Sequence, residues 1–108
     1  MSTTKSRLAY TDCFDFMDQA VADSKGIRVC VGAESNLAYT LRFRLNSARQ
    51  IDRNENAKTY EEGHPLHGRS IYDRLVFRVK EDSDGEWWVY LEIQDTSNAY
   101  VEPLGETA

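Results

Sequence analysis

A hairpin near the C-terminal end is the feature that most constrains the fold of this chain. Residues 70–80 and 86–94 each alternate apolar and polar side chains, and Asp84-Gly85 lies between them. An Asp-Gly pair tolerates the positive φ angles that a tight turn requires, and alternation is typical of strands. The chain is therefore expected to contain an antiparallel hairpin.

Three further segments complete the predicted architecture. Apolar residues recur at helical spacing over 11–24 and again over 34–54, and Ile27–Val31 alternates as a short strand. The longer helix is expected to bury an apolar stripe formed by Leu37, Leu41, Leu45 and Ala48. This α-β-α-β-β order predicts an α+β fold in which two helices pack on one face of a small three-stranded, mainly antiparallel sheet.

The 108 residues, 41% of them hydrophobic, suit a single domain. Residues 1–10 are expected to form a flexible arm, 11–95 the domain, and 96–108 an acidic tail with Tyr100-Val101 as a candidate edge strand. Residues 55–69 contain two glycines and a proline and are expected to form a long loop.

The sequence also indicates where the protein works. It has no apolar run long enough for a membrane span and no apolar leader after Met1. Its two cysteines, Cys13 and Cys30, do not form a CxxC pair. These features predict a cytoplasmic protein with reduced thiols and no membrane contact.

Charge is distributed unevenly along the chain, whose net charge is −5. Ten Lys/Arg stand against six Asp/Glu between Arg28 and Lys80, whereas three stand against twelve outside this range. A basic middle between acidic ends suits an anionic partner, but chance clustering on solvated faces explains it equally well.

The main candidate site lies on the longer helix. Its polar side combines guanidinium, amide and aromatic groups at one-turn spacing: Tyr39, Arg42, Phe43, Asn46, Arg49, Gln50 and Arg53. Guanidinium groups pair with phosphates, amides bond to base edges and rings stack on bases. This side therefore predicts a nucleic-acid contact, and a solvated face is the alternative. Arg44 lies on the opposite flank and is expected to snorkel or to pair with an acid.

A second candidate surface is the outer face of the sheet. If Leu75, Phe77 and Val79 face the helices, alternation places these side chains outside: Arg28, Cys30, Tyr72, Arg74, Val76, Arg78, Trp88 and Tyr90. Cations among aromatic rings suit nucleotides, but the same surface suits a protein partner or a second copy of the chain. The opposite face assignment stays open, because Trp87-Trp88 offers one ring to each side.

Histidines and acids provide weaker candidates. Gly63–Gly68 places His64 and His67 three residues apart, but no third metal ligand follows at a recognisable spacing, so a rigid turn is expected. An acidic stripe on the first helix, Asp12, Asp15 and Asp18, suits solvent or a protein partner. No cofactor or catalytic motif is present, so the chain is expected to use no cofactor and not to be an enzyme.

Several segments resemble small uncharacterised proteins of phages and prophages. The similarity covers residues 41–79 and rests on Leu41–Arg49, Asp52-Arg53, Gly63–Gly68 and Tyr72–Leu75. It implies a phage accessory protein that acts in a bacterial host cytoplasm. Such proteins often bind phage or host nucleic acid, or block a host enzyme.

The leading hypothesis is a non-enzymatic nucleic-acid-binding accessory protein. Its predicted contact residues are Tyr39, Arg42, Phe43, Asn46, Arg49, Arg53, Arg74, Arg78 and Trp88. The acidic hairpin tip and the pI of about 5.0 require this contact to be narrow. The alternative is a protein-interaction module, such as an inhibitor of a host or defence protein, that uses the acidic first helix or the hairpin aromatics. A homodimer is compatible with both.

Overall fold

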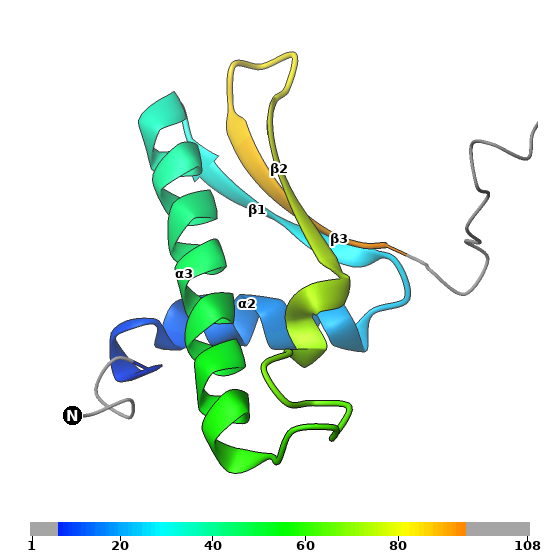
Figure 1. The fold of residues 1–108 in the computed structure, drawn as a ribbon. Helices are drawn as coiled ribbons and strands as arrows, with labels where there is room; N and C mark the ends of the chain where they lie inside the picture. The colour runs from blue at the N-terminus through cyan, green and yellow to red at the C-terminus, as the bar shows by residue number, and fades with distance from the viewer. Residues whose placement is uncertain (1–6, 95–108) are drawn as a thin grey trace, which may run out of the picture.

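The computed structural model describes residues 7–94 (Figure 1). Its elements are α2 (Thr11–Ala22), β1 (Gly26–Gly32), α3 (Ser35–Thr59), the 3-10 helix η1 (Ile71–Arg74), β2 (Leu75–Glu81) and β3 (Trp87–Ile93). The two long helices cover one face of a three-stranded antiparallel sheet, which confirms the expected α+β class. Within residues 7–94 no helix is long and apolar enough to span a membrane. The predicted acidic tail and its candidate edge strand lie outside the described residues.

β3 is the central strand of the sheet. It pairs antiparallel with β1 on one side and with β2 on the other. The β2–β3 hairpin closes through Asp82, whose backbone N–H donates to the Glu86 carbonyl at 2.8 Å. Gly85 has a φ of 82°, a left-handed conformation that any side chain would strain. The hairpin predicted from Asp84-Gly85 is therefore confirmed.

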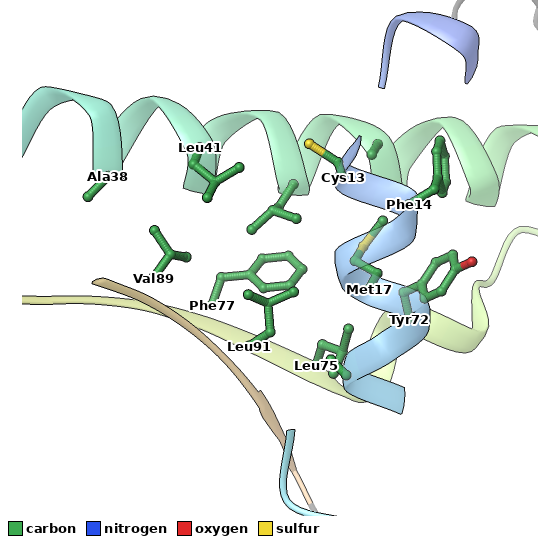
Figure 2. Packing of buried hydrophobic residues seen from close by; sticks show 13 residues of the cluster. Cys13, Phe14, Met17, Ala38, Leu41, Tyr72, Leu75, Phe77, Val89 and Leu91 are labelled. Atoms are coloured by element: carbon green, nitrogen blue, oxygen red, sulfur yellow. The ribbon is translucent and has the colours of Figure 1, made fainter. Parts of the chain in front are cut away.

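The core lies between the helices and the sheet (Figure 2). Its buried apolar side chains come from every layer: Cys13, Phe14, Met17 and Ala20 of α2, Ala38, Leu41, Leu45 and Ala48 of α3, Tyr72 of η1, and Leu75, Phe77, Val89 and Leu91 of the sheet. Leu37 was expected here but is 46% exposed. α2 crosses the middle and second half of α3 rather than its first turn, to which Leu37 belongs (Figure 1).

α3 continues to Thr59, beyond its expected end, because a tertiary contact holds its last turns. Glu55 in this added segment accepts a hydrogen bond from Arg7 at 2.8 Å. Apolar periodicity does not reveal such a contact, because both partners are charged. The loop predicted for residues 55–69 shortens accordingly to residues 60–70.

Residues 7–10 of the flexible arm predicted for residues 1–10 form a helical turn on the domain, and residues 1–6 lie outside the described residues. Arg7 donates to Asp52 at 3.2 Å as well as to Glu55. Its guanidinium carbon also lies 4.0 Å from the centre of the Phe14 ring. These contacts attach the turn to α2 and α3.

β2 begins at Leu75 rather than at Ser70, because η1 precedes it. The Ser70 hydroxyl accepts a hydrogen bond from the Tyr72 N–H at 3.1 Å, and the Asp73 carboxylate accepts one from the Ser70 N–H at 3.1 Å. This reciprocal arrangement is a capping box, which starts a helical turn. It removes Tyr72 and Arg74 from the sheet.

Candidate nucleic-acid interface

Arg49, at the centre of the predicted helix face, points into the protein. Its Nη1 donates to the carbonyl oxygens of Tyr72 and Leu75 at 3.0 and 2.7 Å. Its guanidinium carbon lies 4.6 Å from the centre of the Phe77 ring. Burial lowers the pKa of Arg49 below its ordinary value, because desolvation disfavours the charged form. Arg49 therefore joins α3 to the junction of η1 and β2.

Arg53, one turn further along α3, is held in the same region. Its Nη2 lies 2.7 Å from Oδ1 of Asp73, and its Nε donates to the same oxygen at 2.8 Å. Asp73 also caps η1, so this ion pair ties α3 to the start of that helix. Asn46 accepts a hydrogen bond from Arg49 at 3.0 Å, and Gln50 accepts one from Arg53 at 3.2 Å.

The first half of α3, in contrast, keeps its predicted groups at the surface. Tyr39 and Phe43 are 48% and 70% exposed, and the Arg42 guanidinium carbon lies 5.1 Å from the centre of the Tyr39 ring. No ion pair among residues 7–94 involves Arg42. The prediction that three guanidinium groups project together from α3 into solvent is therefore wrong, since two of them bond within the domain. A role of these residues toward nucleic acid stays a prediction.

The second candidate surface is brought together on the face of the sheet that the helices leave open (Figure 1). In the strand register Tyr90 lies between Arg28 and Arg78. Trp88 lies between Cys30 of β1 and Lys80 of β2. Because Val89 and Leu91 of the same strand are buried, alternation places the rings of Trp88 and Tyr90 on the open face. We call this set the open-face cluster: Arg28, Cys30, Arg78, Lys80, Trp88 and Tyr90.

Cations of the open-face cluster lie against its aromatic rings. The Arg28 guanidinium carbon is 4.1 Å from the centre of the Trp88 ring, and its Nη1 donates to the Tyr90 hydroxyl at 3.3 Å. Nζ of Lys80 lies 4.7 Å from the centre of the Tyr90 ring. Both cations are exposed, so the negative faces of the rings hold positive charge at the surface.

The membership of this face differs in part from the sequence prediction. Tyr72 and Arg74 are in η1, and Tyr72 is buried. Lys80 was missed, although the alternation that places Arg78 outside also points to it. Arg78 is exposed and pairs with Glu92 of β3 at 2.9 Å, a surface ion pair that contributes little stability and can open for another anion.

Asp82 in the hairpin turn holds the indole of Trp88 in place. Its carboxylate accepts hydrogen bonds from Trp88 Nε1 at 2.8 Å and from the backbone N–H groups of Asp84 and Glu86 at 2.9 and 3.0 Å. The hydrogen bond from Trp88 is the main reason why the pKa of Asp82 lies below its ordinary 3.8. From the sequence, Asp82 was expected only to repel phosphates.

The two histidines take part in the turn between α3 and η1. Nδ1 of His64 accepts a hydrogen bond from the Leu66 N–H at 3.0 Å, and its ring stacks on Tyr60 with centroids 4.3 Å apart. Nδ1 of His67 lies 2.7 Å from the Tyr60 carbonyl oxygen. Among residues 7–94 no group of three or more potential ligands is placed to hold a metal ion.

The acidic stripe of α2 is partly used inside the protein. Asp12 pairs with Arg44 at 2.7 Å, which confirms the expected acid partner of Arg44, and Asp18 accepts a hydrogen bond from the Tyr72 hydroxyl. The stripe therefore offers a partner less free negative charge than its sequence suggests.

The two cysteines differ in exposure. Cys13 is fully buried, and burial raises the pKa of its thiol to about 11, whereas Cys30 is exposed.

Comparison of the chain with protein-family models, with curated proteins and with solved structures finds no match in any of the three. The function is therefore inferred from the fold and from the side chains that the fold brings together. Within residues 7–94 the surface with the most distinctive chemistry is the open-face cluster.

Proposed function

We propose that the protein is a non-enzymatic nucleic-acid-binding module whose contact surface is the open face of its sheet. The observation that carries this proposal is the arrangement of three exposed cations around two rings: Arg28, Arg78 and Lys80 around Trp88 and Tyr90. Cations neutralise phosphates, and rings stack on bases whatever their sequence. Arg78 and Trp88 of the sequence prediction belong to this proposed contact. The second half of α3, where Arg49 and Arg53 bond within the domain, does not.

Charge limits the size of this contact. The net charge is −5, and acids lie close to the open-face cluster: Glu92 is on the same face of the sheet and pairs with Arg78, and Asp84 and Glu86 belong to the hairpin tip. These acids would repel the phosphates of a ligand that extended beyond the cluster, so the contact has to be short. Three cations predict that the logarithm of the affinity for a single strand falls with the logarithm of salt concentration with a slope of about −2.

The resemblance of residues 41–79 to phage and prophage proteins supplies a setting for this proposal. In that setting the module is a phage accessory protein that binds phage or host nucleic acid in a bacterial cytoplasm.

The decisive experiment removes cations from the open face without disturbing the core. Labelled DNA and RNA oligonucleotides are titrated at low and at high salt with the wild type and with an Arg28→Thr/Lys80→Thr variant. Threonine suits exposed strand positions. We expect the variant to bind about tenfold more weakly, equivalent to about 1.4 kcal/mol, and to show a shallower salt slope.

A Lys58→Ala/Arg69→Ala variant is the matched control, because it removes two exposed cations that lie away from the open-face cluster. We expect its affinity to stay within about twofold of the wild type. Equal losses in the two variants, or no salt-sensitive binding by the wild type, would refute the proposal.

A protein-interaction module is the second candidate function, and the exposed aromatic residues of α3 favour it. Tyr39 and Phe43 lie on the surface beside Arg42, and aromatic and Arg side chains are enriched at protein interfaces. Pull-downs from host lysate with the wild type and a Phe43→Ser variant test this candidate. A partner captured equally well by both would argue against this surface.

A further inference from the structure

The open-face cluster carries its two rings at consecutive outward positions of the central strand. Trp88 and Tyr90 are separated by one residue, so their side chains leave the sheet about 6.8 Å apart along β3. Each ring is flanked across the sheet by a cation about 4.8 Å away in the neighbouring strand, Lys80 beside Trp88 and both arginines beside Tyr90.

We propose that this face binds single-stranded nucleic acid, with one base stacked at Trp88 and the next at Tyr90. The inference rests on the proposed function and specifies its ligand. The face of an aromatic ring can be used only by a base whose own face is free. In a duplex each base is stacked on its neighbours, so a duplex offers this surface only its phosphates.

The position of Trp88 is set before any ligand arrives. Its indole N–H donates to Asp82, and the Arg28 guanidinium lies 4.1 Å from its ring. A guanidinium plane is itself a surface on which bases stack, so Arg28 and Trp88 together form one stacking position. A side chain fixed in this way loses little conformational entropy when a base binds.

The open-face cluster also limits the length of nucleic acid that it can bind. Phosphates are attracted to Arg28, Arg78 and Lys80 on either side of β3, and the carboxylates of the hairpin turn repel them at one end. Two stacking positions bordered in this way suit a short segment of about three or four nucleotides.

Three oligonucleotides of one length test the inference: a single strand, the same strand paired with its complement, and a strand with the same phosphates but without bases. We expect the single strand to bind at least about tenfold more tightly than the other two. Tyr90→Leu and Trp88→Leu should each weaken binding of the single strand by at least about fivefold and leave the weak binding of the baseless strand unchanged. Far-ultraviolet circular dichroism checks that each variant is folded.

Phe43→Leu is the matched control, because it removes an exposed ring from α3 rather than from the sheet, and it should bind like the wild type. Equal affinity for all three oligonucleotides would overturn the single-strand inference and leave nucleic-acid binding intact. Failure of the wild type to bind any of them would overturn the proposed function as well.

Discussion

At the scale of single residues, the partner of each arginine decides what that arginine contributes. Arg49 donates to two backbone carbonyl oxygens at the η1–β2 junction, whereas Arg42 faces solvent beside Tyr39. A hydrogen bond from a charged donor contributes about 1.5–3 kcal/mol, and its loss leaves a carbonyl group without a partner. The two residues lie on one side of the same helix and differ in what the fold places opposite them.

This difference predicts unequal effects on stability. Arg49→Ala should lower the free energy of unfolding by about 2–3 kcal/mol, because the Leu75 carbonyl loses this charged donor and the Tyr72 carbonyl keeps only the Leu75 N–H. Arg42→Ala should change it by less than about 0.5 kcal/mol, because the half-buried Arg42 has only the Tyr39 ring as a partner and no ion pair among residues 7–94. Urea denaturation followed by tryptophan fluorescence measures both values. Equal destabilisation by the two substitutions would show that Arg49 is not held as the structure has it.

At the scale of elements, the hairpin turn and the open face of the sheet are coupled. Asp82 closes the turn with its backbone and, through its side chain, orients Trp88 at the start of the neighbouring strand. The turn therefore determines both the register of β2 against β3 and the direction of one ring of the open-face cluster.

Substitution of Asp82 should therefore loosen the hairpin turn and release the ring of Trp88, because its carboxylate accepts hydrogen bonds from both. In Asp82→Ala the Trp88 indole N–H loses its acceptor, and we expect its proton resonance to shift and its exchange with solvent to become faster. Asp82→Asn keeps one acceptor oxygen and should preserve much of the wild-type signal. An indole proton that is identical in all three proteins would contradict the hydrogen bond.

At the scale of the whole molecule, the sheet face and the rest of the chain differ in sign of charge. The open-face cluster is cationic, yet the net charge is −5. Residues 95–108 contribute three of the acids, Asp95, Glu102 and Glu106, and no Lys or Arg. Long-range repulsion from such acids slows the approach of an anionic ligand.

Neutralising these three acids should therefore speed association. A variant with Asp95→Asn, Glu102→Gln and Glu106→Gln has a net charge of −2. We expect a higher association rate for a single-stranded oligonucleotide at low salt, and rates that converge with those of the wild type at high salt, where charges are screened. Stopped-flow fluorescence measures both, and an unchanged rate at low salt would exclude this effect.

Periodicity was enough to predict most of the fold, because it follows from local geometry. Spacing of apolar residues identified α2, β1 and α3, and Asp84-Gly85 identified the hairpin. Alternation also divided the side chains of β3 between two faces, although it left open which of the two faces the helices cover. A local signal for η1 was present too, since Ser70 and Asp73 have capping-box spacing.

The amino-acid sequence by itself thus determined the elements, the hairpin and the alternation of side chains along β3. The tertiary structure decided which side of β3 the helices cover, and therefore that Trp88 and Tyr90 lie on the open face. Only the tertiary structure decided which cations are free, because a long side chain bonds to whatever another element brings within its reach. Arg49 and Arg53 meet η1 and its capping acid, which lie some twenty residues further along the chain. Helical spacing describes one face of α3, and it contains no information on what packs against that face.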